Sequence, residues 1–355
     1  MDKKKVGIIN AGAWGTAIGK LIAEKGHAVQ MWDYMQGVVR DINQNHVNSR
    51  YLLGVKLPEN LKATDDITET AASKDFILIA TPSLYLIDTL KQILTVPNIM
   101  EGKTIIGVLT KGFVASPDGP RLIIASMEDY LPGFYRNSLV YISGPSHAEE
   151  VARYKLTGLV SASQNIKNSI KIRELLNSQN LMVFSSFDVA GVQTCAAVKN
   201  VIAIAFGMLD ALVEFSEIFG DNTESLLLAA GLNEIQMIGK ALGSTHPETF
   251  TSIAGVGDLD VTCRSRYGRN RRFGREVIHD RIPDRYNNLD DLIENIAEIG
   301  YLPEGAIATK YVQEISQKYK LKLPVSGTVF SILNKQSEPL EAIKNMLHTL
   351  TGISV

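Results

Sequence analysis

The fold is decided by one stretch near the N-terminus, Val6-Gly7-Ile8-Ile9-Asn10-Ala11-Gly12-Ala13-Trp14-Gly15-Thr16-Ala17. Its pattern is a buried strand, a tight glycine turn and the start of a helix, as at the opening of a dinucleotide-binding domain. Gly12 has no side chain and allows a pyrophosphate to approach, and the following helix presents its N–H groups and positive dipole end. Asn10 replaces the first fingerprint glycine but tolerates left-handed backbone. Alone, the stretch also fits a plain βα turn.

A second strand, at positions 27–33, ends in a carboxylate. Asp33 follows the glycines by about 20 residues, the distance at which an acidic side chain contacts the adenosine ribose. A carboxylate there would repel a 2′-phosphate, which favours NAD over NADP, although NADP remains possible. The alternative is that Asp33 only caps the following helix.

Length and composition describe a two-domain protein without a strong global charge. The 355 residues exceed one typical domain. A net charge of −2 and 45% hydrophobic residues predict no nucleic-acid partner and no binding to a membrane surface. Cys195 and Cys263 form no disulfide or zinc pattern, so we expect a cytoplasmic protein without a metal. The apolar segment 189–213 contains Lys199 and is predicted to be a buried helix rather than a membrane span.

Strand and helix patterns alternate up to about Ser186 and then become helical. The alternation predicts a Rossmann-type, doubly wound, mainly parallel α/β domain over residues 1–188. The helical pattern predicts an all-α substrate-binding domain over residues 189–355. Two connections, residues 51–66 and 115–120, are predicted to be loops, and an active site is expected in the cleft between the domains.

Lys199 is the most informative single residue. It lies in an apolar helix, where burial disfavours the ammonium form and suits a lysine to give and take protons. The alternatives are a lysine that extends to the surface or pairs with an acid. Residues 253–260 are predicted to form a glycine-rich loop that ends at a helix start. Asp258 in this loop is the candidate partner of Lys199; it also fits a substrate ligand or a helix cap.

A cluster of arginines follows Asp258. Six arginines lie between Arg264 and Arg275, which predicts a compact phosphate site because the guanidinium fork binds phosphate bidentately. Asn270 is placed at a helix start, where N–H groups add to such a site. A nucleic-acid patch is the alternative, but a chain with a net charge of −2 offers no basic face over the whole fold to support it.

Three further stretches follow predicted strands. Thr81-Pro82-Ser83 suits a turn beside the nicotinamide ribose, and Lys111 brings an ammonium group to the end of another strand. In residues 143–149, Ser146 is predicted to cap a helix, and His147 is predicted to be structural. A strand-ending turn and a surface lysine are the plain alternatives for the first two.

Together these motifs resemble a known family. The stretches are Gly12-x-x-Gly15, Thr110-Lys111-Gly112, Ser143-Gly144-Pro145-Ser146, Val198-Lys199-Asn200-Val201, Gly220-Asp221-Asn222-Thr223, Gly255-Val256-Gly257-Asp258-Leu259 and Arg269-Asn270-Arg271-Arg272-Phe273-Gly274. Their order over nearly the whole chain resembles NAD(P)-dependent glycerol-3-phosphate dehydrogenase of the bacterial type. The resemblance implies interconversion of dihydroxyacetone phosphate and sn-glycerol 3-phosphate for phospholipid synthesis, by a homodimer.

The predicted site residues combine the residue patterns with this resemblance. Lys199 is the predicted acid/base, and Lys111 and Asp258 are the other predicted catalytic residues. The predicted substrate-binding residues are Lys111, Gly144, Ser146, Asp258, Gly268, Arg269 and Asn270. The predicted dinucleotide-binding residues are Asn10, Gly12, Ala13, Trp14, Gly15, Asp33, Pro82, Lys111, Ala148, Arg269 and Glu304.

The chain departs from the family pattern at four positions, Asn10, Gln193, Ala230 and Gly268. None of these is a predicted proton-transfer residue. One alternative is a β-hydroxyacid dehydrogenase of the 6-phosphogluconate type, in which glycines precede the helical lysine and the asparagine follows one turn later. The present sequence, Ala196-Ala197-Val198-Lys199-Asn200, counts against it. The other alternative is a protein that senses NADH without turnover.

Overall fold

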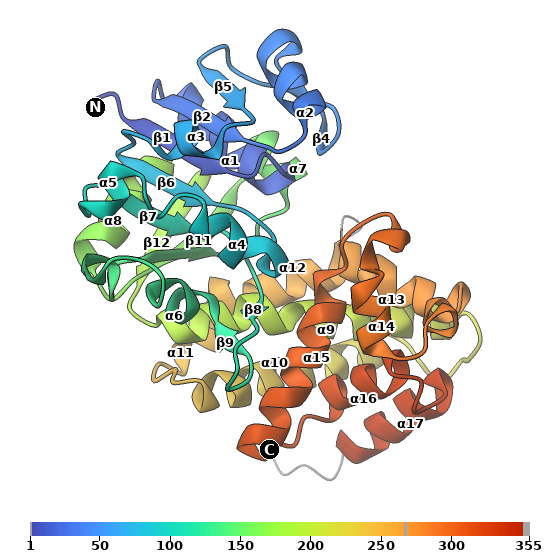
Figure 1. Ribbon diagram of the computed structural model, residues 1–355. Coiled ribbons are helices and arrows are strands. Elements are labelled where there is room, and N and C mark those ends of the chain that lie inside the picture. The colour runs from blue at the N-terminus through green and yellow to red at the C-terminus, as the bar shows by residue number, and fades with distance from the viewer. Residues whose placement is uncertain (1, 266–267, 351–355) are drawn as a thin grey trace. The chain divides into compact units, whose positions relative to one another are not determined.

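The chain divides into two compact units, shown in a computed structural model that describes residues 2–265 and 268–350 (Figure 1). The first unit comprises Met1–Val114 and Leu122–Val189, and the second comprises Ala115–Arg121 and Ala190–Val355. The predicted boundary at residue 188 places the segment Ala115–Arg121 in the dinucleotide-binding domain. In the structure this segment belongs with the helical unit instead.

An eight-stranded sheet forms the centre of the first unit, in the order β12-β11-β10-β7-β6-β1-β2-β5. Every neighbouring pair is parallel except β10 and β11. The strands are β1 (Lys5–Ile9), β2 (Ala28–Trp32), β5 (Leu61–Thr64), β6 (Phe76–Ile79), β7 (Ile105–Val108), β10 (Val140–Ser143), β11 (Thr157–Ala162) and β12 (Leu181–Ser186). The predicted mainly parallel α/β domain is confirmed.

Helices cover both faces of this sheet. The helices are α1 (Ala13–Glu24), α2 (Gln36–Arg40), α3 (Ile67–Ala71), α4 (Leu86–Lys91), α5 (Pro97–Met100), α6 (Ile123–Glu128), α7 (Ala148–Ala152) and α8 (Ile166–Leu176). Successive residues of β1 face opposite sides. A Cβ on Gly7 would lie 2.3 Å from the Thr70 carbonyl oxygen of α3, whereas a Cβ on Gly15 or Gly19 of α1 would lie 3.4 or 3.0 Å from the Ile8 side chain. These close approaches explain the glycines in β1 and α1.

The predicted loop over residues 51–66 is wrong, because it contains two strands. β4 (Leu52–Lys56) pairs with β3 (Val47–Asn48), and β5 pairs in parallel with β2 as the edge of the large sheet. Gly54 and Pro58 suggest a loop, yet Gly54 lies inside β4 with a left-handed φ of +74°. By contrast, residues 115–120 carry no strand or helix, as predicted, between β8 (Phe113–Val114) and β9 (Arg121–Leu122).

The second unit is helical, as predicted. Its helices are α9 (Val189–Val213), α10 (Asp221–Ala241), α11 (Glu248–Thr251), α12 (Asp258–Arg264), α13 (Arg269–His279), α14 (Leu289–Glu294), α15 (Glu304–Tyr319), α16 (Pro324–Leu333) and α17 (Pro339–Leu350). The stretch 253–257, expected as a glycine-rich loop, instead forms a π-helical turn that leads directly into α12.

Helix α9 is the core of the helical unit. Among the described residues it is the one helix long and apolar enough to cross a membrane, but 89% of its most apolar window is buried inside the protein. The prediction of a buried helix is therefore confirmed. A Cβ on Gly207 would lie 1.9 Å from the Arg271 carbonyl oxygen, and one on Gly274 would lie 2.1 Å from that of Ile204. Helices α9 and α13 thus contact each other backbone to backbone.

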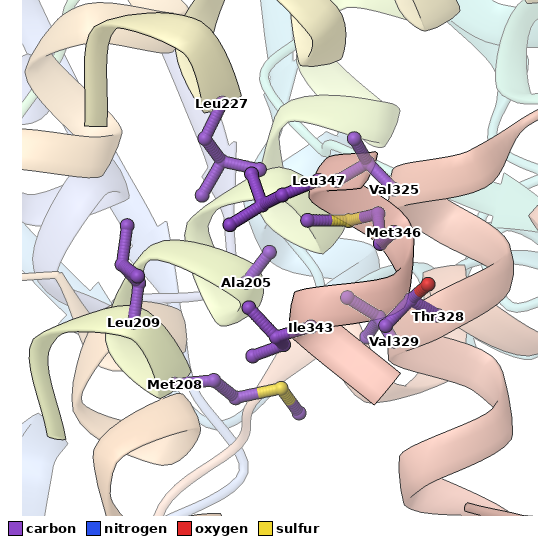
Figure 2. A pocket seen from close by; sticks show the side chains of 10 residues that line it. All are labelled: Ala205, Met208, Leu209, Leu227, Val325, Thr328, Val329, Ile343, Met346 and Leu347. Atoms are coloured by element: carbon purple, nitrogen blue, oxygen red, sulfur yellow. The ribbon is translucent and has the colours of Figure 1, made fainter. Parts of the chain in front are cut away.

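A small cavity lies where α9, α10, α16 and α17 meet (Figure 2). Its lining is apolar apart from Thr328, and its volume of about 10 Å³ is that of roughly one water molecule. This cavity is a packing defect of the helical core and has no room for a phosphorylated triose.

Candidate active site

The turn after β1 has the conformation that Asn10 was expected to tolerate. Its φ is +85°, in the left-handed region, and its Oδ1 accepts a hydrogen bond from the Gly12 N–H at 2.7 Å. Asparagine therefore holds the turn that the fingerprint glycine would otherwise form. A Cβ on Gly15 would lie 2.4 Å from the Asn10 carbonyl oxygen, so only glycine fits there.

The start of α1 fits an anionic dinucleotide. Gly12 is the N-cap in extended conformation, and the N–H groups of the first turn, from Ala13 to Gly15, have no intrahelical acceptor. The Trp14 Nε1 atom is buried and has no hydrogen-bond partner among the described residues. Unpartnered donors beside a glycine turn are suited to pyrophosphate oxygens.

Asp33 lies beside this turn, immediately after β2. It is 1% exposed, and its carboxylate accepts a hydrogen bond from the Met35 N–H at 2.9 Å. Burial raises the pKa of Asp33, while the N–H groups of Met35 and Ala11 and the charge of Arg50 counteract the effect. Asp33 therefore holds the entry of α2, and its contact with a ribose stays a prediction.

The other predicted dinucleotide residues are divided between the units. Pro82 precedes a single 3₁₀ turn, Ser83–Tyr85, after β6, and Ala148 begins α7, which packs against α1. Arg269 and Glu304 begin α13 and α15 in the helical unit. Contacts of these four residues with a dinucleotide remain predictions.

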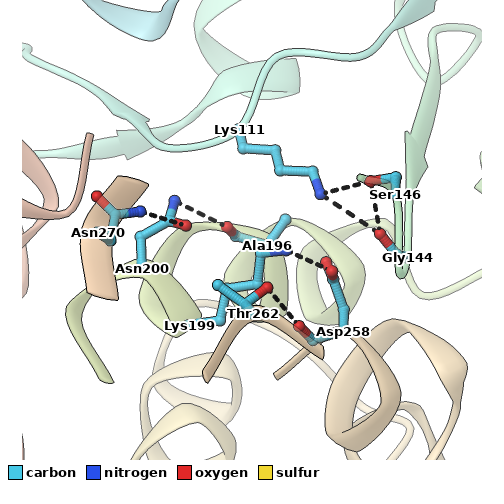
Figure 3. A network of polar contacts seen from close by, with 9 residues as sticks. All are labelled: Lys111, Gly144, Ser146, Ala196, Lys199, Asn200, Asp258, Thr262 and Asn270. Atoms are coloured by element: carbon cyan, nitrogen blue, oxygen red, sulfur yellow. Dashed lines mark hydrogen bonds and ion pairs between the residues drawn. The ribbon is translucent and has the colours of Figure 1, made fainter. Parts of the chain in front are cut away.

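Lys111 lies close to residues that follow another strand of the same sheet (Figure 3). Because β7 and β10 are parallel neighbours, Lys111 and Ser146 emerge at the same edge. The Lys111 Nζ donates to the Ser146 hydroxyl at 3.1 Å and to the Gly144 carbonyl at 3.4 Å. Gly144 has a φ of +125°, and a Cβ there would be 3.0 Å from the Gly158 carbonyl oxygen.

The expectation that Ser146 caps a helix is wrong. Helix α7 has His147 as its N-cap residue, without a side-chain capping bond. The Ser146 hydroxyl instead donates to the Gly144 carbonyl at 2.8 Å and accepts from Lys111. Ser146 therefore holds the Lys111 ammonium group rather than a helix end.

Lys199 and Asp258 form a buried ion pair in the helical unit (Figure 3). Lys199 is 5% exposed on α9, and Asp258 is fully buried as the first residue of α12. The predicted partnership of the two residues is confirmed. The Thr262 hydroxyl donates to the Asp258 carbonyl at 2.6 Å and so ties the carboxylate's own residue into α12.

Two asparagines lie on neighbouring helices of the same unit. The Asn270 Nδ2 donates to the Asn200 Oδ1 at 3.0 Å, and the Asn270 Oδ1 accepts from the Gly305 N–H at 2.9 Å. The Asn270 side chain thereby connects α9, α13 and α15. Its backbone N–H lies in the first turn of α13, so the predicted substrate contact of Asn270 is one that this backbone group would make.

Most of the arginines near α13 have acidic partners. Arg271 forms a two-pronged pair with Asp210 at 2.6 and 2.7 Å; the other pairs are Arg264 with Asp260, Arg272 with Glu276 and Arg275 with Glu214. They line an open groove of about 520 Å³. Arg269 is exposed and has no ion pair in the ranges that the structure describes. Arg266 lies outside those ranges. Among the described arginines of this cluster, the predicted anion site thus narrows to Arg269 beside Gly268, the N-cap of α13.

The sequence did not point to the residues that support these groups. Asn48 donates to the Ala11 carbonyl, and Asp210 pairs with Arg271; both partners are far away in the sequence. Thr262 donates to the Asp258 carbonyl one helical turn earlier, a bond that the local pattern does not predict. Of the departures from the family pattern, Gln193 is buried in α9 and Ala230 lies in α10. No group of three or more metal-ligating side chains occurs in the described part of the chain.

Comparison with known proteins places this chain among dehydrogenases. The two models of NAD-dependent glycerol-3-phosphate dehydrogenase, for its N-terminus and its C-terminus, match residues 5–169 and 188–344. Glycerol-3-phosphate dehydrogenase [NAD(P)+] of Treponema denticola is 54% identical over 349 residues, covering 97% of this chain and 98% of that protein. The Bacillus subtilis enzyme of that name is 33% identical over 97% of this chain and 94% of its own.

The likeness extends to solved structures. A crystal structure of glycerol-3-phosphate dehydrogenase from Coxiella burnetii superposes with a TM-score of 0.84. It is 32% identical and covers 97% of this chain and 99% of its own. Both units of the present chain therefore have counterparts in one solved protein.

Proposed function

This chain belongs to the NAD-dependent glycerol-3-phosphate dehydrogenase family, and from that premise we propose that it interconverts dihydroxyacetone phosphate and sn-glycerol 3-phosphate with NAD(P)H. The observation that carries the proposal is the buried pair of Lys199 and Asp258 on α9 and α12. Such a pair is suited to moving a proton at the carbonyl oxygen of a ketone.

The proposed chemistry assigns one role to each buried group. Bound NAD(P)H supplies the hydride. Lys199 donates a proton from Nζ to the oxygen that develops negative charge at C2 of the substrate, so that a cation lies where the anion forms. Asp258 orients the Lys199 ammonium group and balances its charge. In the reverse direction Lys199 accepts the hydroxyl proton.

The phosphate of the substrate requires a separate anion site. We assign it to Arg269, with the backbone N–H groups of Gly268 and Asn270 at the start of α13. Lys111, held by Ser146 and Gly144, is assigned to the substrate and to the dinucleotide. Its ammonium group adds positive charge for either ligand.

The cofactor preference follows from Asp33. We propose NAD as the preferred cofactor, because a carboxylate at the end of β2 disfavours a 2′-phosphate. The ratio of kcat/KM for NADH and NADPH measures this preference, and equal values would contradict the assignment.

Further proposals concern the cellular setting of the enzyme. We propose a cytoplasmic homodimer, joined through the helical unit, that supplies glycerol 3-phosphate for phospholipid synthesis. Light scattering should give twice the chain mass of 38.9 kDa. Depletion of the enzyme should reduce the cellular pool of glycerol 3-phosphate.

The decisive experiment is an NADH-oxidation assay with dihydroxyacetone phosphate and a pair of lysine variants. Lys199→Met should lower kcat roughly 10²- to 10⁴-fold, the contribution of a general acid, while NADH binding stays near normal. Lys20→Met is the matched control, because Lys20 is also buried and is paired with Glu24 at 2.7 Å on α1. We expect Lys20→Met to retain turnover.

The assay also separates the alternatives. A β-hydroxyacid dehydrogenase would turn over a phosphorylated hydroxy acid and leave dihydroxyacetone phosphate unchanged. A sensor would bind NADH without oxidising it. Normal turnover by Lys199→Met would refute the assignment of the proton donor.

A further inference from the structure

Asn48 is a fully buried polar residue outside the predicted site. It lies in the two-residue strand β3 and is 1% exposed. Its Nδ2 donates to the Ala11 carbonyl oxygen at 2.7 Å and to the Thr16 hydroxyl at 2.8 Å, and its Oδ1 accepts from the Tyr51 N–H at 3.2 Å. A side chain from β3 thus reaches the turn between β1 and α1.

The Ala11 carbonyl is held by two donors. Besides Asn48, the Thr16 hydroxyl donates to it at 3.0 Å. The Ala11 carbonyl is therefore fixed by two side-chain donors.

The bond to Ala11 determines the direction of the next N–H. The Ala11 carbonyl and the Gly12 N–H belong to one planar trans peptide unit, in which C=O and N–H point in opposite directions. Holding the carbonyl toward Asn48 and Thr16 therefore turns the Gly12 N–H away from them. That N–H donates to the Asn10 Oδ1, on the side opposite the buried asparagine.

We propose that Asn48 is a positioning residue for the dinucleotide pyrophosphate. It locks the Ala11–Gly12 peptide plane, and with it the entry of α1, so that the N–H groups of the first turn, from Ala13 to Gly15, point together toward the pyrophosphate. This inference rests on the proposed dinucleotide site. Without the Asn48 amide, the Ala11 carbonyl keeps only the hydrogen bond from the Thr16 hydroxyl. The turn then samples orientations in which the N–H groups of the first turn of α1 no longer point the same way.

The chain offers a matched control in Asn60. The Asn60 Nδ2 also donates to two main-chain carbonyls, those of Ala23 at 2.7 Å and His27 at 3.0 Å. These lie at the opposite end of α1. Asn60→Ala therefore removes a similar pair of hydrogen bonds from the same unit without touching the glycine turn.

The test compares Asn48→Ala with Asn60→Ala in the full-length protein. We expect Asn48→Ala to raise the Kd and KM for NADH roughly tenfold, the loss that corresponds to one well-placed hydrogen bond. The kcat at saturating NADH and the KM for dihydroxyacetone phosphate should change less than about twofold. Asn60→Ala should leave the Kd for NADH unchanged and, because Asn60 is exposed, should lower the melting temperature less than Asn48→Ala.

A probe of the pyrophosphate contact itself is inhibition by ADP and by adenosine. Asn48→Ala should weaken inhibition by ADP in parallel with NADH and leave inhibition by adenosine unchanged. Thr16→Val, which removes the second donor to Ala11 but keeps the side-chain shape, should act in the same direction and keeps the test available if Asn48→Ala fails to fold.

The outcomes separate this inference from the proposed function. If the unmodified protein does not bind and oxidise NADH, the proposed function is wrong. If it does, but Asn48→Ala and Thr16→Val lower only the melting temperature and leave the Kd for NADH unchanged, Asn48 is merely structural and the inference is overturned.

Discussion

Arg269 differs from the other arginines around α13 in what surrounds its charge. Arg271 and Arg272 have carboxylate partners within 2.7 Å, so their charges are balanced inside the protein. Arg269 lies exposed at the first position of the helix, beside N–H groups that carry partial positive charge. Of the described arginines in this cluster, it is the one best placed to bind an external phosphate.

We expect Arg269→Ala to raise the KM for dihydroxyacetone phosphate by roughly 10- to 100-fold, because a charge-assisted contact to phosphate is lost. The matched control is Arg272→Ala on the same helix, which should change this KM less than about twofold. Steady-state kinetics with varied substrate measure both. An unchanged KM in Arg269→Ala would remove Arg269 from the phosphate site.

Single residues also show what the sequence can predict. The left-handed backbone of Asn10 was predicted from the intrinsic preference of asparagine. The pairing of Lys199 with Asp258 was predicted because a buried ammonium group needs an opposite charge. Asn48 was not predicted, because its partners lie 32 and 37 residues away and its own surroundings are polar. A buried amide has no local sequence signal.

At the scale of elements, a buried carboxylate from α10 accepts hydrogen bonds from the first turn of α16. Glu234 is 2% exposed and accepts hydrogen bonds from the Val325 N–H, the Ser326 N–H and the Ser326 hydroxyl, at 2.5, 3.0 and 2.6 Å. These bonds satisfy donors at the helix N-terminus. Burial nevertheless outweighs them and raises the pKa of Glu234 to about 7.

This raised pKa predicts a pH-dependent stability. An acid whose folded pKa lies above its unfolded value binds more protons when folded, so its contribution falls as pH rises through the interval from about 4.5 to about 7. The melting temperature of the unmodified protein should therefore decline relative to that of Glu234→Gln between pH 4.5 and 7.5. The difference between the two melting temperatures at each pH removes the contribution of groups that titrate in both proteins.

An exposed glutamate supplies the control for this comparison. Glu248→Gln should give a melting profile parallel to that of the unmodified protein across the same pH range. If the Glu234→Gln profile is also parallel, Glu234 does not titrate with folding in that interval.

Elements differ in how well sequence predicts them. The strands β6 and β7 coincide with the apolar runs at residues 76–80 and 104–109, because local pattern and burial agree there. β5 was missed, since Leu61–Thr64 is short and becomes a strand only through its long-range pairing with β2. The π-helical turn at Ile253–Gly257 was also missed, because its glycines suggest a loop.

At the scale of the whole molecule, the chain passes between its two units three times. The passages are at residues 114/115, 121/122 and 189/190. The general architecture was predictable because the change from alternating to helical periodicity is strong. The excursion of Ala115–Arg121 was not, because residues 115–120 have no regular structure and carry no periodic signal.

Helix α15 donates one hydrogen bond to this segment of the helical unit. The Lys318 Nζ donates to the Asp118 carbonyl oxygen at 2.9 Å. Lys318→Ala removes it, and we expect hydrogen exchange and proteolytic cleavage of residues 115–121 to accelerate roughly fivefold, as loss of about 1 kcal/mol predicts. Lys322→Ala, an exposed lysine just beyond α15, should leave both rates unchanged. Equal rates in the two variants would show that side chains other than Lys318 anchor the segment.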